Sequence, residues 1–328
     1  MKIQIEQLSS TVHLALLKYG YTEEEANTIG DVLLYAQMRG NNQGVVKLTG
    51  SAKGLVKTAD QQPTRVIKDT PVSQLIDGGM QFGMIVMKQA VEAALEKAKK
   101  TGIGLVGIKN TASSTGAIGF YAREIAKQGM IGIIFAGSPP TVSPHNSFEP
   151  KFGTNPMAYG FPTTKEPMVF DMATSAMAFF GLVEAATAGK TIAGDVAYDN
   201  EGNLTTDPNK AMDGAIRPFD RSYKGYGLNL VIEILTGPLV QASYVGIKAE
   251  QGWGNVIIAI DPNIFTDTET FKQQMTELLD NVRTAKPLPG KEVIIPGEHG
   301  DEIMKRVLDS GEIEIEDNLW EGLQKVVA

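Results

Sequence analysis

The apolar positions near the start of the chain recur at helical spacing. Residues 22–38 begin with Thr22, continue with three glutamates and then become apolar every three or four positions, which predicts a capped amphipathic helix. A shorter helix is predicted before it, over residues 4–19. Residues 39–54 are rich in Gly, Asn and Gln and therefore predict a loop that enters a further helical segment. This loop is the first place along the chain where we expect chemistry.

Further along the chain, apolar strands alternate with amphipathic helices. The strand-like segments lie at 65–77, 103–108, 130–136, 169–171 and 256–260, and the helical ones at 84–100, 116–128, 173–188, 226–239 and 265–284. Residues 138–156 form a proline-rich irregular piece, polar turn residues fill 198–222, and a Pro/Gly-rich link over 286–300 leads to an acidic helical end. Alternation of this kind favours an α/β core.

Length and charge narrow the class of protein. At 328 residues the chain exceeds the usual size of a single core, so two domains, or one with a large insertion, are expected. A formal charge of -8 argues against a nucleic-acid partner, because such binding depends on clustered Lys and Arg. The sequence lacks the pattern of a signal peptide and any apolar run of about 18 residues, so we expect no membrane partner and a cytoplasmic location.

The residue types present limit the chemistry. The sequence has no cysteine, which excludes disulfides, thiolate nucleophiles and cysteine-ligated metal centres. Its three histidines, His13, His145 and His299, lie far apart in sequence, so no histidine-rich metal site is expected. The chemistry must therefore depend on carboxylates, amines, hydroxyls, amides or a bound cofactor.

Four short motifs bear on cofactor or anion binding. Residues 102–107 match G-x-G-x-x-G, but they follow a helix and lie inside a strand, so no Rossmann site is predicted. Residues 153–156 read Gly-Thr-Asn-Pro, the GTNP tract, and alone indicate a turn. Residues 171–175 leave a strand and enter a helix, which fits either an anion at the helix N-terminus or plain capping. Residues 224–227 set a lysine beside two glycines at a helix start, as an anion contact would.

Taken together, these motifs resemble in order and spacing the type-2 malate/L-lactate dehydrogenase family, which includes ureidoglycolate dehydrogenase, diketogulonate reductase, sulfolactate dehydrogenase and the piperideine- and pyrroline-carboxylate reductases. The resemblance covers essentially the whole chain. It is carried by Arg39-Gly40 with Gly44-Val45, by Asn110 with Gly116-Ala117, by Ser138, and by residues 153–156, 170–175, 224–228 and 296–298. It implies a homodimer with a non-Rossmann NAD(P)-binding α/β fold. The α/β region is expected over residues 71–284, and a mainly helical region over residues 1–70 plus 285–328.

The resemblance also implies roles for individual residues. Those that match the family's contacts to NAD or NADP are Ser138, Asp171, Met172, Ala173, Thr174, Lys224, Gly225, Pro296, Gly297 and Glu298. Thr154 and Asn155 fall near the nicotinamide and a small carboxylate substrate. Lys47 stands where the family has a substrate-binding arginine, so it keeps the positive charge but loses the bidentate fork for a carboxylate.

The resemblance breaks at the residues that transfer a proton. Where the family has a histidine in a Ser-His-Gly loop, this chain has Gln43, which cannot titrate but can donate an amide hydrogen bond to a carbonyl. The family's second histidine is replaced by Ser113 or Ser114, and a one-residue length change leaves that choice open. The loss matters for ketone reduction, because general acid catalysis typically contributes about 10²–10⁴-fold.

Three explanations are open for this departure. In the first, His145 supplies the proton from the loop before the GTNP tract, although a surface histidine is the simpler interpretation. In the second, the substrate is a cyclic 2-imino acid that binds as an iminium, so hydride addition needs no proton donor. In the third, the protein only binds cofactor or a metabolite. The sequence thus predicts an NAD(P)-dependent oxidoreductase of small 2-oxo or 2-hydroxy carboxylates, with an imino acid reductase and a non-catalytic binding protein as alternatives.

Overall fold

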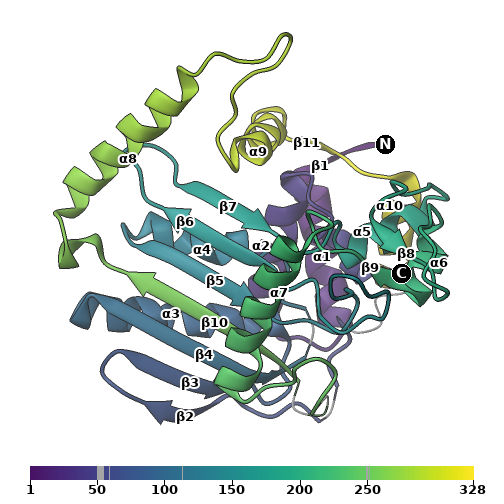
Figure 1. Ribbon diagram of the computed structural model, residues 1–328, viewed down its shortest axis with the longest axis horizontal. Helices are drawn as coiled ribbons and strands as arrows, with labels where there is room; N and C mark the ends of the chain where they lie inside the picture. The colour runs from purple at the N-terminus through teal and green to yellow at the C-terminus, as the bar shows by residue number, and fades with distance from the viewer. Residues whose placement is uncertain (50–54, 59, 113, 249, 251) are drawn as a thin grey trace.

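A seven-stranded mixed sheet forms the centre of the protein (Figure 1). The structure is a computed structural model, and it describes residues 1–49, 55–58, 60–112, 114–248, 250 and 252–328. In spatial order the strands are β2 (Arg65–Asp69), β3 (Ser73–Asp77), β4 (Ile103–Thr111), β10 (Trp253–Ile260), β5 (Ile131–Ala136), β6 (Met157–Phe161) and β7 (Met168–Met172). Only β3 and β4 pair in parallel; the other neighbours are antiparallel. The predicted α/β, non-Rossmann fold is confirmed.

Helices cover both faces of this sheet. On one face, α3 (Gly83–Thr101) packs against β4 and β10, and α4 (Gly119–Lys127) packs against β5, β6 and β7. On the other face, α7 (Tyr223–Thr236) and the short η3 (Pro238–Val240) cover β10 and β4. The glycine motif at 102–107 serves this packing, because a Cβ on Gly104 would lie 2.0 Å from the Ala94 carbonyl oxygen of α3.

The two chain ends meet in a mainly helical region beside the sheet. It contains α1 (Ile5–Lys18), α2 (Glu23–Met38), η1 (Val45–Leu48), α9 (Glu298–Ser310) and α10 (Asp317–Val327). Strand β1 (Lys2–Gln4) pairs with β11 (Glu312–Glu314) and joins the ends directly. Thr22 and Glu25 form the predicted capping box of α2. Buried side chains of α1, α2 and α10 share one core with the sheet, and β2 begins at Arg65, before the expected start of the α/β region at residue 71.

A small lobe beyond the sheet has a core of its own. It comprises α5 (Phe179–Thr187), α6 (Pro208–Asp213), β8 (Ala197–Tyr198) and β9 (Ala215–Ile216). The predicted helix over 173–188 is wrong in its first turn and a half, because the amides of Thr174 and Ala176 donate to carbonyls of Thr154 and Arg217 instead. Helix α6 lies where only turns were expected, and its start is capped by Asp207.

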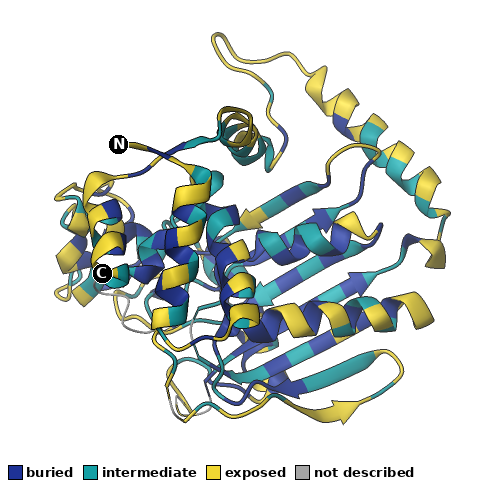
Figure 2. Cartoon of the chain, turned by 180° about the vertical axis from the view of Figure 1, so that it is seen from behind, coloured by how far each residue is buried: buried dark blue, intermediate teal, exposed yellow. Residues whose placement is uncertain are grey.

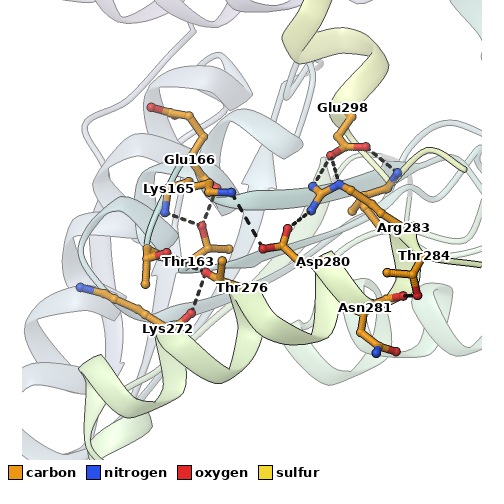
Figure 3. A network of polar contacts seen from close by, with 12 residues as sticks. Thr163, Lys165, Glu166, Lys272, Thr276, Asp280, Asn281, Arg283, Thr284 and Glu298 are labelled. Carbon is orange, nitrogen blue, oxygen red and sulfur yellow. Dashed lines mark hydrogen bonds and ion pairs between the residues drawn. The ribbon is translucent and has the colours of Figure 1, made fainter.

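Helix α8 (Thr268–Arg283) lies at the outer edge of the sheet and is mostly exposed (Figure 2). The short η5 (Pro262–Ile264) precedes it. Polar contacts hold it to the turn between β6 and β7 and to the start of α9 (Figure 3). The hydroxyls of Thr276 and Thr164 lie 2.9 Å apart, and Arg283 forms an ion pair with Glu298. In the part of the chain that the structure describes, no helix is long and apolar enough to cross a membrane.

Candidate active site

One cavity lies where several strands of the sheet begin or end and has a volume of about 360 Å³; we call it the main cavity because it has the largest group of predicted site residues in its wall. Strands β4, β5 and β7 end there, and β6 and β10 begin there. The loop after α2 closes it from the helical region, and the start of α5 closes it from the small lobe. The cavity therefore collects residues from segments that are far apart in sequence.

Seven of the predicted site residues line this cavity. They are Gln43, Ser114, Ser138, Thr154, Asp171, Met172 and Ala173. Ser113 lies outside the described residues. The Thr141 hydroxyl also belongs to the lining and is buried without a hydrogen-bond partner among the described residues. The cavity wall thus offers several hydroxyl and amide groups that a bound molecule can use.

A second cavity, of about 490 Å³, adjoins the first at Asn41 and Asp171, which line both. Pro296 and Gly297 line it, and Gly297 has a φ of 95°, which favours glycine. A Cβ on Gly297 would lie 2.4 Å from the Val169 carbonyl oxygen, so the glycine lets this loop approach β7 closely. Together the two cavities form one elongated site.

Asp171 stands at the junction of the two cavities. Its carboxylate accepts a hydrogen bond of 2.8 Å from the amide of Gly119, at the start of α4. Surrounding protein atoms raise the pKa of Asp171 to about 6, although that hydrogen bond and the charge of Arg39 oppose the shift. The side chain still opens onto both cavities, so water reaches it and weakens this effect.

Asn155 does not face the cavity, contrary to its expected contact with substrate. Its side chain is fully buried, and Nδ2 donates to Asn229 Oδ1 at 2.8 Å and to Glu233 Oε2 at 2.6 Å, both on α7. Asn229 Nδ2 in turn donates to the Gly153 carbonyl at 3.0 Å. With a φ of 37°, Asn155 has a left-handed backbone, and its two neighbours Thr154 and Pro156 line the cavity. Asn155 therefore anchors the GTNP tract to α7.

Thr174 fixes the same tract from the opposite side. Its hydroxyl lies 3.1 Å from the Thr154 carbonyl oxygen and 3.0 Å from that of Asn155, and donates toward them. Its amide also donates to the Thr154 carbonyl, at 2.9 Å. Since α5 begins only at Phe179, the expected helix N-terminus at 171–175 is absent, and Thr174 has no group free for an anion.

Lys47, in η1, is separated from the main cavity by an aromatic ring. Its side chain is fully buried, and Nζ has no hydrogen-bond partner among the described residues. Nζ lies 3.3 Å from the centroid of the Phe180 ring, and Phe180 lines the cavity. Burial without a counter-ion lowers the pKa of Lys47 well below its usual value.

Four other predicted positions, Lys224, Gly225, Glu298 and His145, lie outside both cavity linings. Lys224 is exposed, and the Asp220 carboxylate accepts the amide of Gly225 at 3.0 Å, so the α7 start already has an anionic partner. The Glu298 carboxylate is held by Arg283 and by the Ile295 amide. His145 is exposed in a turn, so its geometry does not support the expectation of a proton donor.

Sequence reasoning missed several residues that shape the site. Phe179 and Phe180 were assigned to a continuous helix, and Trp253 at the start of β10 carried no local signal. Asn229 and Glu233 are two polar residues within an apolar helix, and that pattern was a signal of a buried polar contact.

The sequence and the fold match those of known dehydrogenases. A family model described as malate/L-lactate dehydrogenase matches residues 3–324. The malate/(S)-sulfolactate dehydrogenase of Methanothermus fervidus is 35% identical, with 99% of this chain and 97% of that protein covered. Ureidoglycolate dehydrogenase (NAD(+)) of Escherichia coli K12 is 31% identical, with 98% and 95% covered. The solved sulfolactate dehydrogenase of Methanocaldococcus jannaschii has a TM-score of 0.86 at 32% identity, covering 99% of this chain and 96% of that one.

These matches define a dehydrogenase of the α/β class with a mixed sheet. The chain belongs to the malate/L-lactate dehydrogenase family. The predicted family resemblance is thereby confirmed over nearly the full length of the chain.

Proposed function

We propose that the chain is an oxidoreductase that transfers a hydride between NAD or NADP and a small 2-oxo or 2-hydroxy carboxylate. The observation that carries the proposal is the main cavity, because Gln43, Ser138, Thr154 and Asp171 all line it. Family membership supports the same reaction class.

The elongated site fits a dinucleotide. The two joined cavities offer space on both sides of Asp171, and the unpartnered hydroxyl of Thr141 is a free polar contact in the wall. We assign the coenzyme contacts to Ser138, Asp171 and Met172 with the loop of Gly297. When bound, the coenzyme supplies or accepts the hydride.

The chain's own residues orient the substrate. We assign the position beside the reacting carbon to Thr154 and Ser138, whose hydroxyl oxygens lie 3.3 Å apart. The Gln43 amide donates a hydrogen bond to the substrate oxygen or leaves room for a ring nitrogen. Lys47 receives the carboxylate once the Phe180 ring turns aside, because a buried ammonium group without a partner favours an anion.

A cyclic 2-imino acid reductase is the second candidate function. Among the described residues of the main cavity, the one ionisable side chain is Asp171, and Gln43 cannot release a proton. An iminium substrate needs no proton during hydride addition, so this wall suits it. Reduction of a ketone instead requires a proton on the developing alkoxide. Because Gln43 cannot release one, the proton would have to come from water or from another group.

We also propose that the protein is a homodimer. The outer face of α7 leaves Tyr223, Val231 and Ile234 at least half exposed, and Leu239 extends this apolar surface. Single exposed apolar residues are common, whereas several of them on one helix and the turn after it are typical of a protein interface. Light scattering on the purified chain tests the proposal, and a monomeric mass at micromolar concentration would contradict it.

The function is tested by coenzyme binding and then by turnover. Fluorescence titration with NADH and NADPH is expected to show saturable binding of at least one coenzyme. A panel of 2-oxo acids, cyclic 2-imino acids and ureidoglycolate is then assayed with wild type and Gln43→His. Faster ketone reduction by Gln43→His would show that the missing proton donor limits the wild-type rate. If the chain binds neither coenzyme, the proposal is defeated.

A further inference from the structure

Two consecutive aromatic residues form part of the substrate end of the main cavity. Phe179 and Phe180 begin α5, line the cavity, and meet edge to face with ring centroids 6.3 Å apart. The next residue, Gly181, lies so close to the Gln43 loop that a Cβ on it would be 2.9 Å from Asn42 Nδ2. The aromatic pair is therefore packed beside the loop that leads to Lys47.

The Phe180 ring covers the cation proposed to hold the substrate. Lys47 Nζ lies 3.3 Å from the ring centroid and has no hydrogen-bond partner among the described residues. The π face of a ring stabilises a cation, but less than a carboxylate does in a desolvated site. Lys47 can thus accept one anionic group, and a substrate in the cavity reaches it only when the Phe180 ring turns aside.

The described lining of the main cavity has no second cation, and Arg39, which lines the adjoining cavity, is already paired with Asp301. Among the described lining residues of the main cavity, Asp171 is the single charged side chain, and its charge is negative when ionised. Ile118, Met172 and Trp253 add apolar surface to that of the two phenylalanines. A second anionic group on the substrate would lose hydration there without gaining a partner, whereas an apolar group would be accommodated.

We propose that the site selects monoanionic substrates, namely 2-oxo or 2-imino acids with one carboxylate and an apolar remainder, and that Phe180 is a specificity-determining residue. This inference rests on the proposed function and narrows its substrate class. The relatives' named substrates fall on both sides of the division, because malate and sulfolactate carry two anionic groups and ureidoglycolate carries one. By the chemistry of its cavity wall, we group this chain with the relatives whose substrate carries one anionic group.

Matched substrate pairs test the selectivity in the full-length protein. 2-Oxobutanoate and oxaloacetate share a four-carbon chain and differ by a methyl group against a carboxylate; 2-oxopentanoate and 2-oxoglutarate form a second pair. With NADH and NADPH, kcat/KM for the monoanion is expected to exceed that for the dianion by roughly 100-fold in each pair. The thermal shift that each acid causes in the presence of coenzyme measures binding without turnover and is expected to follow the same order.

Two variants separate the roles of Phe180. Phe180→Leu keeps an apolar wall and is expected to keep the preference for the monoanion. Phe180→Arg adds a cation and is expected to shift the kcat/KM ratio toward the dianion by roughly tenfold or more. If Phe180→Arg does not fold, the wild-type ratios and thermal shifts still decide.

The outcomes of these experiments test the substrate selectivity separately from the oxidoreductase function on which it rests. A wild-type preference for oxaloacetate and 2-oxoglutarate would overturn the inference and leave the oxidoreductase intact. Binding of coenzyme with no effect of any 2-oxo or 2-imino acid on turnover or thermal stability would overturn both. An unchanged ratio in Phe180→Arg, with the protein folded, would remove the role of Phe180.

Discussion

Replacement of Asn155 by aspartate tests how α7 holds the cavity wall. The side chain keeps its shape, but Nδ2, which donates to Glu233 at 2.6 Å and to Asn229 Oδ1 at 2.8 Å, becomes an oxygen. Asn229 Oδ1 and Glu233 Oε2 are then acceptors without that donor, while the Val245 amide still donates to Glu233 Oε1. Asn155→Asp therefore changes the hydrogen bonding of the site without changing its volume.

The burial of Asn155 and Glu233 sets the expected loss in the free energy of unfolding. Asn155 is 0% exposed and Glu233 is 7% exposed, so water cannot replace the lost donor. Losing a buried hydrogen bond to a charged group costs about 1.5–3 kcal/mol, and a second carboxylate at this distance adds repulsion. We expect a loss of about 3 kcal/mol in the free energy of unfolding at pH 8, or a fall in Tm of roughly 5–10 °C.

The loss is expected to depend on pH. Burial already raises the pKa of Glu233, and a neighbouring carboxylate raises it further, so the pair shares a proton at low pH. A group whose pKa is higher in the folded state stabilises the fold at low pH, and this stabilisation is lost as pH rises through the folded-state pKa. Asn155→Asp should therefore be closer to wild type at pH 5 than at pH 8.

Unfolding curves at both pH values provide the assay, together with kcat and KM. Asn318→Asp, at an exposed position in α10, is the matched control and is expected to change stability by less than about 0.5 kcal/mol. Because Asn155 fixes Thr154 at the cavity, kcat should fall along with stability. If Asn155→Asp behaves like the control at pH 8, the buried network does not hold the GTNP tract.

Three further substitutions test other parts of the site. Lys47→Met should raise KM for carboxylate substrates roughly 100-fold. It should also raise Tm, because it removes an amine that is buried without a hydrogen-bond partner among the described residues. Lys68→Met, at an exposed position, is the control and should keep the wild-type KM; a wild-type KM in Lys47→Met as well would show that Lys47 binds no substrate. Without coenzyme, Asp171→Asn should flatten the fall in Tm that wild type shows as pH rises from about 4 through about 6, because the raised pKa of Asp171 makes its ionisation unfavourable in the fold; an unchanged profile contradicts this. Gly297→Ala should lower the free energy of unfolding by about 1–3 kcal/mol, measured by denaturant, because of its φ of 95° and the close Val169 carbonyl, and wild-type stability would refute the steric argument.

Local signals predicted the helices well where the helix ends carried their own caps. Thr22 with Glu25 gave a complete capping box, and α2 begins one residue later, at Glu23. Asp207, followed by a proline, is a helix start of the same kind. Because the residues around it are polar, the pattern predicted turns instead of the short α6. The capping residues of a short helix are thus present in the sequence, but a helix of one or two turns among polar residues is easily taken for a series of turns.

The start of α5 could not be predicted from local pattern. Residues 173–178 have the composition of a helix, yet the amides of Thr174 and Ala176 bond to Thr154 and Arg217. Those partners become neighbours only when the chain folds, so tertiary contacts override local preference here. The consequence is functional, because the delayed start places Phe179 and Phe180 at the cavity.

The family motifs predicted which segments form the site but not which way each side chain points. Thr154 lines the cavity, whereas Asn155, its neighbour, points into α7. Lys47 lies behind Phe180 rather than in the open wall. A positive φ and a ring over an ammonium group both depend on packing between distant segments, so neither is visible in the order of residues.

The most direct test of the account is the substrate-dependent oxidation of NADH or NADPH by the purified chain, followed by the coenzyme's near-ultraviolet absorbance. With saturating 2-oxobutanoate or a cyclic 2-imino acid, we expect oxidation of at least one coenzyme well above the rate without substrate. At a substrate concentration near the wild-type KM, that rate should fall when Lys47 is replaced by methionine, because KM rises. No substrate-dependent oxidation of either coenzyme, by a protein shown to be folded and to bind coenzyme, would contradict the central claim.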